Sequence, residues 1–373
     1  MKVVKLKDIC TKGSSSLKQK DVQNGNGQYP VYGAGGIAGY IDSYHQEKEY
    51  IGIVKDGSGI GRVMFLPPKS SVIGTLQYIL PKPGYDINYI GYCLKSLDLT
   101  SHKQGAAIPH IYFKDYGEKL VNVEESLDEQ RKIVARLNAT FDKIDEMQKN
   151  AEQAYEEAKA IYLKQLELAM TPRKGWKEAK LKALCSKIGS GATPRGGKKI
   201  YISEGCSLIR SLNVHKTFFK YDELAHITDQ AAQALKGVTI HENDVLFNIT
   251  GASIARCCVV PSDILPARVN QHVSILRTDG SEILPDFLCY VLNSPQHQKS
   301  LLAIGENGAT RQAITKADLE GHLVRYPDIK EQKLIVEKLK TLSDRLKKME
   351  NNYAKLIVEL SIFKQAILKE TFE

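Results

Sequence analysis

A regular apolar stripe in the C-terminal part of the chain constrains its fold more than any other feature. The stripe residues follow one another at alternating steps of four and three: Ile335, Leu339, Leu342, Leu346, Met349, Tyr353, Leu356, Leu360, Phe363 and Ile367. This spacing places all of them on one narrow face of a helix, as in a coiled coil. At ~1.5 Å per residue the helix would be roughly 60 Å long. Because that exceeds an ordinary globular core, the helix needs a partner helix.

The same stripe occurs 202 positions earlier in the chain. Its positions are Ile133, Leu137, Thr140, Ile144, Met147, Ala151, Ala154, Ala158, Ile161 and Gln165. The residues that lead into the two stripes also match, with Glu129-Gln130 in one copy and Glu331-Gln332 in the other. The openings of the two remaining blocks, 5–12 and 180–187, correspond as well. The chain is therefore an internal duplication of a block followed by a long helix.

Charge and side-chain size favour pairing of the two helices with each other. Residues 128–170 contain seven basic and nine acidic side chains, whereas residues 330–372 contain ten and six. Opposite net charge favours this pair over self-pairing. Antiparallel pairing also places the alanines at 151, 154 and 158 against the bulky residues at 349, 353 and 356, so that small side chains face large ones. We predict an antiparallel intramolecular coiled coil with a pseudo-two-fold relation between the halves.

Short strand-like runs separated by turn formers fill the two blocks. The runs are 29–32, 50–54, 62–66 and 77–80 in the first block, and 207–210, 245–249, 257–260 and 272–276 in the second. Each block continues with a helix candidate (87–97 or 285–292) and a last strand (119–123 or 322–326). We predict an α+β fold in which α/β domains at 1–127 and 171–329 alternate with long helices at 128–170 and 330–373.

Composition and motifs argue against several classes of function. No apolar run approaches the ~18–20 residues of a membrane span. The seven cysteines include no CxxC pair, and the nine histidines lack metal-ligand spacing. The glycines at 33–39 depart from the dinucleotide-binding fingerprint, and 191–199 lacks a glycine and the Ser or Thr of a P-loop. We predict a soluble, cytoplasmic chain with no metal, no cofactor and no catalytic residue of its own.

Basic and polar side chains on glycine-bearing loops are the candidates for nucleic-acid contact. Arg, Lys, Asn, Gln and Thr are the side chains that bind phosphates and read base edges. Each one taken alone is equally compatible with a solvated surface position. The candidates are Lys55, Ser58, Arg62, Lys103 and Gln104 in the first block, and Thr193, Arg195, Lys198, Arg210, Asn213, Asn248, Asn270, Gln271 and Arg311 in the second.

The whole chain resembles the specificity subunit of Type I restriction–modification systems. The matching stretches are 29–36, 55–59, 191–194 and the two Glu-Gln dipeptides, within the duplicated architecture. The resemblance implies a non-catalytic subunit in which two target-recognition domains read a bipartite double-stranded DNA target with a fixed gap. It also implies two adenine methyltransferase subunits as partners and, for cleavage, ATP-dependent restriction subunits. The recognition domains are the variable part of the family, so the resemblance assigns no DNA-contacting residue.

Two other functions stay open at this point. The recognition subunit of a Type II methyltransferase–nuclease would share the DNA role but have other partners. A protein-binding coiled-coil scaffold would show no salt-sensitive DNA affinity, because that affinity comes from phosphate contacts.

Overall fold

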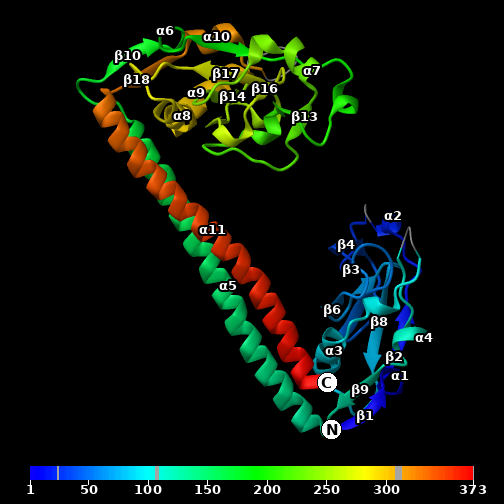
Figure 1. Cartoon of the computed structure of the whole chain (residues 1–373). Helices are drawn as coiled ribbons and strands as arrows, with labels where there is room; N and C mark the ends of the chain where they lie inside the picture. Colours follow the sequence, from blue (N-terminus) through cyan, green and yellow to red (C-terminus); the bar gives the residue numbers. More distant parts are fainter. Residues whose placement is uncertain (23–24, 106–108, 307–312, 373) are drawn as a thin grey trace. The chain divides into compact units, whose positions relative to one another are not determined.

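The computed structural model describes residues 1–22, 25–105, 109–306 and 313–372 (Figure 1). The chain forms two compact units. The first unit comprises Met1–Glu152 and Asn352–Glu373, and the second comprises Gln153–Asn351. Each unit therefore contains one globular block together with part of each long helix.

Three sheets make up the first block. Its strands are β1 (Lys2–Lys5), β2 (Cys10–Ser14), β3 (Tyr29–Gly33), β4 (Gly36–Ile41), β5 (Tyr50–Val54), β6 (Val63–Leu66), β7 (Ser71–Val72), β8 (Leu76–Pro81) and β9 (Leu120–Val123). They pair as a four-stranded sheet in the order β2-β8-β5-β6, a three-stranded sheet in the order β4-β3-β7 and the pair β1-β9. The predicted strands of this block are confirmed, with ends shifted by a residue or two.

The strands of the second block repeat this topology. They are β10 (Lys177–Lys180), β11 (Lys187–Ser190), β12 (Cys206–Ile209), β13 (Ala225–Ile227), β14 (Val245–Asn248), β15 (Cys257–Val259), β16 (Ala267–Val269), β17 (Val273–Arg277) and β18 (Leu323–Tyr326). The sheet orders are β11-β17-β14-β15, β13-β12-β16 and β10-β18. In both three-stranded sheets the central strand has one antiparallel and one parallel neighbour. The predicted internal repeat is confirmed strand by strand.

Short helices cover the sheets and connect the strands. The first block has α1 (Leu6–Ile9), α2 (Gln19–Val22), α3 (Ile87–Ser96), η1 (Thr100–His102) and α4 (Phe113–Tyr116). The second has α6 (Leu181–Leu184), η2 (Gly197–Ile200), η3 (Ser211–Asn213), α7 (Asp229–Ala234), η4 (Lys236–Val238), η5 (Gly251–Ser253), η6 (Ser262–Ile264), α8 (Pro285–Asn293), α9 (Pro295–Glu306) and α10 (Lys316–Gly321). The predicted helices at 87–97 and 285–292 are α3 and α8. The Asp86 carboxylate caps α3 by accepting hydrogen bonds from the amides of Asn88 and Tyr89.

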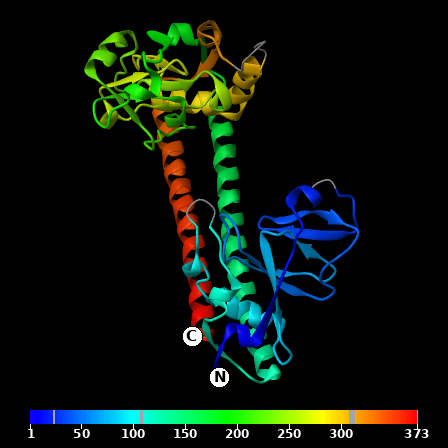
Figure 2. The same ribbon diagram turned by 90° about the vertical axis from the view of Figure 1, so that its right-hand side faces the viewer.

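The long helices α5 (Leu127–Met170) and α11 (Ile329–Phe372) pair in antiparallel orientation, as predicted (Figures 1 and 2). In the first unit the start of α5 shares a core with the end of α11, where Leu137 and Leu368 are buried together. In the second unit the end of α5 packs with the start of α11, where Leu166 and Leu339 are buried. Among the described residues, no helix is both long enough and apolar enough to cross a membrane.

The predicted stripes are wrong at several positions. Met147 is 53% exposed, Ile161 is 61% exposed and Phe363 is 54% exposed. On α5 the inner face instead runs through half-buried residues at 148, 151, 155, 158 and 162, while the alanine at 154 is exposed. The stripe changes after Ile144, because the next inner residue is 148 and not 147, so that two steps of four follow one another at 140, 144 and 148. These steps shift the later residues of a 3.6-residue helix around its axis.

Tyrosines occupy part of this shifted inner face. Tyr155 and Tyr162 replace the expected Ala154 and Ile161. Burial and the neighbouring Glu350 carboxylate on α11 raise the pKa of Tyr155. The predicted contact of alanines with bulky residues therefore fails at position 154, where the neighbouring aromatic side chain takes the inner place.

Candidate nucleic-acid interface

The same turn connects a central strand of the four-stranded sheet to the neighbouring edge strand in each block. We call it the glycine–arginine turn: Gly57 to Arg62 between β5 and β6, and Gly251 to Arg256 between β14 and β15. Its backbone hydrogen bonds are duplicated. The Gly61 amide donates to the Val54 carbonyl at 2.9 Å, and the Ala255 amide donates to the Asn248 carbonyl at 2.8 Å. The carbonyls of the two arginines accept from the amides of Val54 and Asn248 at 3.0 and 2.8 Å.

Two positions of the turn have a left-handed backbone in both copies. The first is Gly57 with φ +92° and Gly251 with φ +75°. The second is Gly61 with φ +81° in the first copy, but Ala255 with φ +66° in the second. Glycine adopts this conformation without steric cost, whereas alanine does not. The turn is therefore kept in the second block even where its sequence no longer favours it.

The arginine that ends each turn lies beside the connection between two strands of the three-stranded sheet. In the first block the Arg62 guanidinium donates to the Ala34 carbonyl at 2.8 Å, within the β3–β4 turn. In the second block Arg256 lies next to His215 in the β12–β13 connection, where burial and the positive charge of Arg256 lower the pKa of His215. The glycines at 33–36 thus form a hairpin turn that the arginine contacts.

A second loop joins the turn in each block. The Ile111 amide donates to the Lys55 carbonyl and the Ile314 amide to the Ile249 carbonyl, both at 2.9 Å. In the first block the His110 ring also lies 2.7 Å from the Asp56 carboxylate. Burial opposes ionisation of Asp56, but hydrogen bonds from Lys55 and His110 lower its pKa overall. Residues 110–111 and 313–314, which follow two glycine-bearing loops of the sequence, therefore lie next to the glycine–arginine turns.

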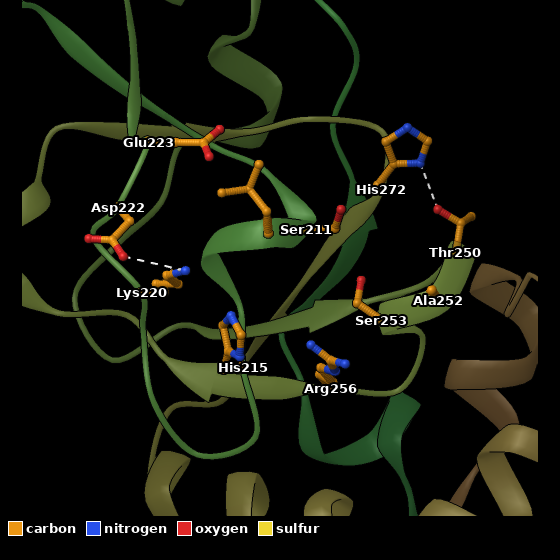
Figure 3. Close-up of a pocket in the computed structure, with 12 residues that line it drawn as sticks. Ser211, His215, Lys220, Asp222, Glu223, Thr250, Ala252, Ser253, Arg256 and His272 are labelled. Atoms are coloured by element: carbon orange, nitrogen blue, oxygen red, sulfur yellow. Dashed lines mark hydrogen bonds and ion pairs between the residues drawn. The ribbon is translucent and has the colours of Figure 1, made fainter. Parts of the chain in front are cut away.

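In the second block these elements surround an open cleft of about 580 Å³ (Figure 3). Its lining is mostly polar and carries charges of both signs: Ser211, Leu212, His215, Lys220, Asp222, Glu223, Thr250, Gly251, Ala252, Ser253, Arg256 and His272. The His272 ring is held on both sides, by the Thr250 hydroxyl at 2.6 Å and the Gln271 amide at 3.0 Å. Such a set of fixed donors and acceptors is suited to base edges and phosphates.

The structure places the sequence candidates in three groups. Ser58, Arg62, Lys103, Gln104, Thr193, Arg195, Lys198 and Gln271 are exposed, and Lys55 and Arg210 are half-buried. Asn213, Asn248 and Asn270 are buried. Arg311 lies outside the described residues. Ser58 and Arg62 lie in the first glycine–arginine turn and Lys55 lies just before it, while Thr193 hydrogen-bonds to Gln271, the residue before the cleft residue His272.

The buried asparagines hold the loops of the cleft. The Asn213 amide donates to the carbonyls of Lys220 and Asp222 at 3.0 and 3.2 Å. The Asn248 amide donates to the Ser211 carbonyl at 2.9 Å. The Arg210 guanidinium is also engaged within the protein, by the Glu223 carbonyl. These three side chains shape the cleft from within, and we leave them out of the surface proposed to touch DNA.

Four residues that line the cleft, Arg256, His215, Lys220 and His272, were not among the candidates chosen from the sequence. The signal for Arg256 was present, because Gly251-Ala252-Ser253-Ile254-Ala255-Arg256 aligns with Gly57-Ser58-Gly59-Ile60-Gly61-Arg62. Only the glycine, isoleucine and arginine of this six-residue pattern are shared, which is too little to notice without the structure. Among the described residues, no group of three or more His, Cys, Asp or Glu is placed to hold a metal ion.

We expect Arg62→Ala and Arg256→Ala each to weaken binding of the protein to duplex DNA. Loss of a phosphate contact lowers affinity for every sequence and reduces the salt slope by about one unit. Loss of a base contact costs ~1–3 kcal/mol and relaxes specificity at one position of one half-site. Titration of cognate and scrambled duplexes at several salt concentrations separates these results. The control is Arg131→Ala, an exposed arginine on α5, and wild-type binding by both test variants would contradict the assignment.

Comparison with known proteins gives one family. The family model described as the Type I restriction modification DNA specificity domain matches residues 1–154 and 173–356. The Type I restriction enzyme EcoBI specificity subunit of Escherichia coli is 29% identical over 174 residues, which cover 46% of this chain and 35% of that protein. The match thus spans about a third of the length of this curated relative.

Solved structures show the same fold. A chain described under "Structural basis underlying complex assembly and conformational transition of the type I R-M system" has a TM-score of 0.74 and 17% identity, over 99% of this chain and 96% of that one. The HsdS subunit from Thermoanaerobacter tengcongensis has a TM-score of 0.54 and 16% identity, over 99% of this chain and 95% of that one. The likeness extends over both blocks and both long helices.

Proposed function

Because the chain belongs to the family of Type I restriction modification DNA specificity domains, we propose that it is the DNA-recognition subunit of a Type I restriction–modification complex. The recognition domains are 1–127 and 171–329, and each reads one half of a bipartite target. The long helices, 128–170 and 330–373, set the gap between the halves. The observation that carries this proposal is the duplicated glycine–arginine turn, which presents one arginine in each of two otherwise divergent domains.

The dimensions of the long helices agree with this role. A helix of 44 residues is roughly 65 Å long at ~1.5 Å per residue. Half-sites read from one face of DNA lie about one turn apart, ~34–36 Å. Phosphate contacts from the exposed cations would supply the sequence-independent part of the affinity, which falls as salt rises.

The kinds of partner are those that the family implies, and the duplication supports two copies of one of them. Two adenine methyltransferase subunits would dock on the coiled coil, one on each half, and ATP-dependent restriction subunits would join through that complex in the cytoplasm. The exposed apolar Ile161 and Phe363 support two docking positions, because they occupy the same place in the two copies of the helix. The methyltransferase subunits would have to extrude the target adenine from the duplex, since a methylated base is reached only outside the stack.

The proposal is tested by co-expressing the chain with its methyltransferase subunit and mapping methylated adenines across the genome. We expect one bipartite sequence with a fixed gap. Replacing 13–110 with the matching segment of another family member should change one half of that sequence and leave the other half intact, because each domain reads independently. The control is the same exchange in the second domain. Methylation at single, undivided sites, or a change in both halves, would contradict the proposal.

A further inference from the structure

Two buried glutamines occupy the same place in the two copies of the fold. Gln130 is the fourth residue of α5, and Gln332 is the fourth residue of α11. Neither side chain has any exposed surface. A buried amide is costly unless it is hydrogen-bonded, so the partners of each amide show what these side chains do.

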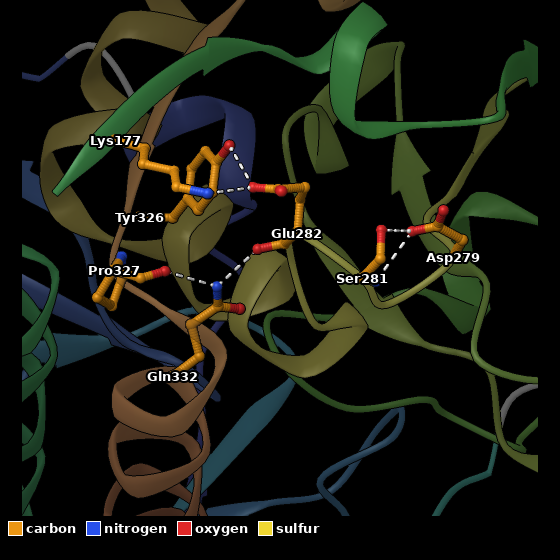
Figure 4. A network of polar contacts seen from close by, with 7 residues as sticks. All are labelled: Lys177, Asp279, Ser281, Glu282, Tyr326, Pro327 and Gln332. Atoms are coloured by element: carbon orange, nitrogen blue, oxygen red, sulfur yellow. Dashed lines mark hydrogen bonds and ion pairs between the residues drawn. The ribbon is translucent and has the colours of Figure 1, made fainter.

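Gln332 joins the start of α11 to two other segments of the second unit, 282–284 and the residue after β18 (Figure 4). Its Oε1 accepts a hydrogen bond from the Leu284 amide at 2.8 Å. Its Nε2 donates to the carbonyls of Glu282 and Pro327 at 2.8 and 2.9 Å. Leu284 directly precedes α8, as its N-cap residue, and Pro327 directly follows β18. The first turn of α11 is therefore tied to a helix and to the last strand of the globular block.

Gln130 makes the same three connections in the first unit. Its Oε1 accepts from the Asp86 amide at 2.8 Å. Its Nε2 donates to the carbonyls of Gly84 and Glu124 at 3.2 and 2.8 Å. Asp86 directly precedes α3, as its N-cap residue, and Glu124 directly follows β9. Two divergent halves of the chain thus keep one arrangement of three hydrogen bonds around one side chain.

The surrounding polar groups differ between the copies, so the glutamine is the shared element. In the second unit the Glu282 carboxylate also pairs with Lys177 at 2.8 Å and accepts from the Tyr326 hydroxyl at 3.3 Å (Figure 4). The first unit has Gly84 at the place of Glu282 and so lacks this ion pair. A fully bonded buried polar group fixes geometry through directional contacts. The glutamines therefore fix the direction in which each long helix leaves its domain.

We infer that Gln130 and Gln332 are positioning residues that set the gap length of the DNA target. This inference rests on the proposed function, because a gap exists only if two domains read two half-sites. Because each helix is long, a small change in its direction at one end produces a large displacement at the other end. A tilt of roughly 3° at one end of a helix roughly 65 Å long moves the other end by about 3.4 Å, the rise of one base pair.

The test uses the full chain assembled with its methyltransferase subunits. Gln130→Met and Gln332→Met keep the side-chain volume but remove all three hydrogen bonds, while Gln130→Glu and Gln332→Glu keep the accepting oxygen. The controls are Arg131→Met and Lys333→Met at the next position of each helix, where both side chains are exposed. Each complex is given duplexes in which the same half-sites are separated by the cognate gap, or by one base pair less or more.

For the Met variants we expect the ratio of methylation of duplexes with a non-cognate gap to methylation of the duplex with the cognate gap to rise about tenfold. The loss of one to two net hydrogen bonds is large enough for such a change. The half-site sequences should stay unchanged, and the two controls should behave like the wild type. Wild-type gap selectivity in the folded variants overturns the inference. If neither the Met nor the Glu variants fold, the glutamines are only structural, and the inference also fails. If the wild-type complex methylates no bipartite site at all, that result refutes the proposed function instead.

Discussion

Replacing Leu339 with Lys is expected to unfold the second unit. Leu339 on α11 has no exposed surface and shares a core with Leu166 and Met170 of α5 and with residues of the globular block. Truncating such a side chain to alanine costs ~2–5 kcal/mol, and an ammonium at this place adds the cost of burying an unpaired charge. Because one residue links both helices and the block, its loss disrupts all three.

Urea unfolding followed by circular dichroism, together with co-purification of the methyltransferase subunit, measures this effect. The matched control is Leu334→Lys, five positions earlier on the same helix, where the leucine is 62% exposed. We expect that variant to lie within ~0.5 kcal/mol of the wild type. If the two variants unfold at the same urea concentration, Leu339 is not at the junction that the structure shows.

Asp244→Ala is expected to give the second large effect. The buried Asp244 carboxylate accepts two hydrogen bonds from the Arg277 guanidinium, both at 2.7 Å, and one from the His241 amide at 2.8 Å. This pair connects the segment before β14 to the end of β17. Removing one partner of a buried pair typically costs ~3–5 kcal/mol, because the other charge stays behind unpaired. Because Arg277 is partly exposed, water can solvate its unpaired guanidinium, and the loss of stability will lie toward the lower end of this range.

Thermal and urea unfolding of the Asp244→Ala chain measure the change, and Glu320→Ala is the matched control. Glu320 pairs with Lys316 on the surface of α10 at 3.5 Å, and such pairs contribute only ~0–1 kcal/mol. We expect the Asp244 variant to lose stability in the second unit alone. Equal stability of the two variants would show that the Asp244–Arg277 pair does not hold the sheet together.

Elements with a similar sequence pattern in both halves of the chain were the easiest to predict, because each half supported the prediction made for the other. The helices α3 and α8, the antiparallel long helices and ten of the described strands were predicted, whereas β1, β2, β4, β7, β10, β11, β13 and β16 were not. The stripe was less predictable. Ile161 and Phe363 are apolar and have the spacing of the stripe, yet both side chains are exposed. The inner face depends on where consecutive steps of four rotate the helix, and on α5 it includes Tyr155 where an aliphatic residue was expected.

The candidate site was harder to predict than the fold. Residue type identified Arg62 but could not separate an asparagine that faces solvent from one that holds a loop. The Asn213 amide donates to carbonyls of the same loop, at Lys220 and Asp222, and the Asn248 amide donates to the distant Ser211 carbonyl. Neither convergence can be recognised from residue type alone. Arg256 was overlooked because the structural equivalence of its turn with Gly57 to Arg62 rests on backbone conformation more than on residue identity.

The composition of the two units has a consequence for the order of events at the ribosome. The second unit is one continuous segment, Gln153–Asn351, whereas the first needs Asn352–Glu373 to be complete. Phe372 lies in the core of the first unit, with its ring 5.1 Å from that of Tyr89. Domains generally fold as units while the chain is being synthesised. Part of the core of the first unit therefore stays exposed to solvent until α11, which is translated last, has left the ribosome.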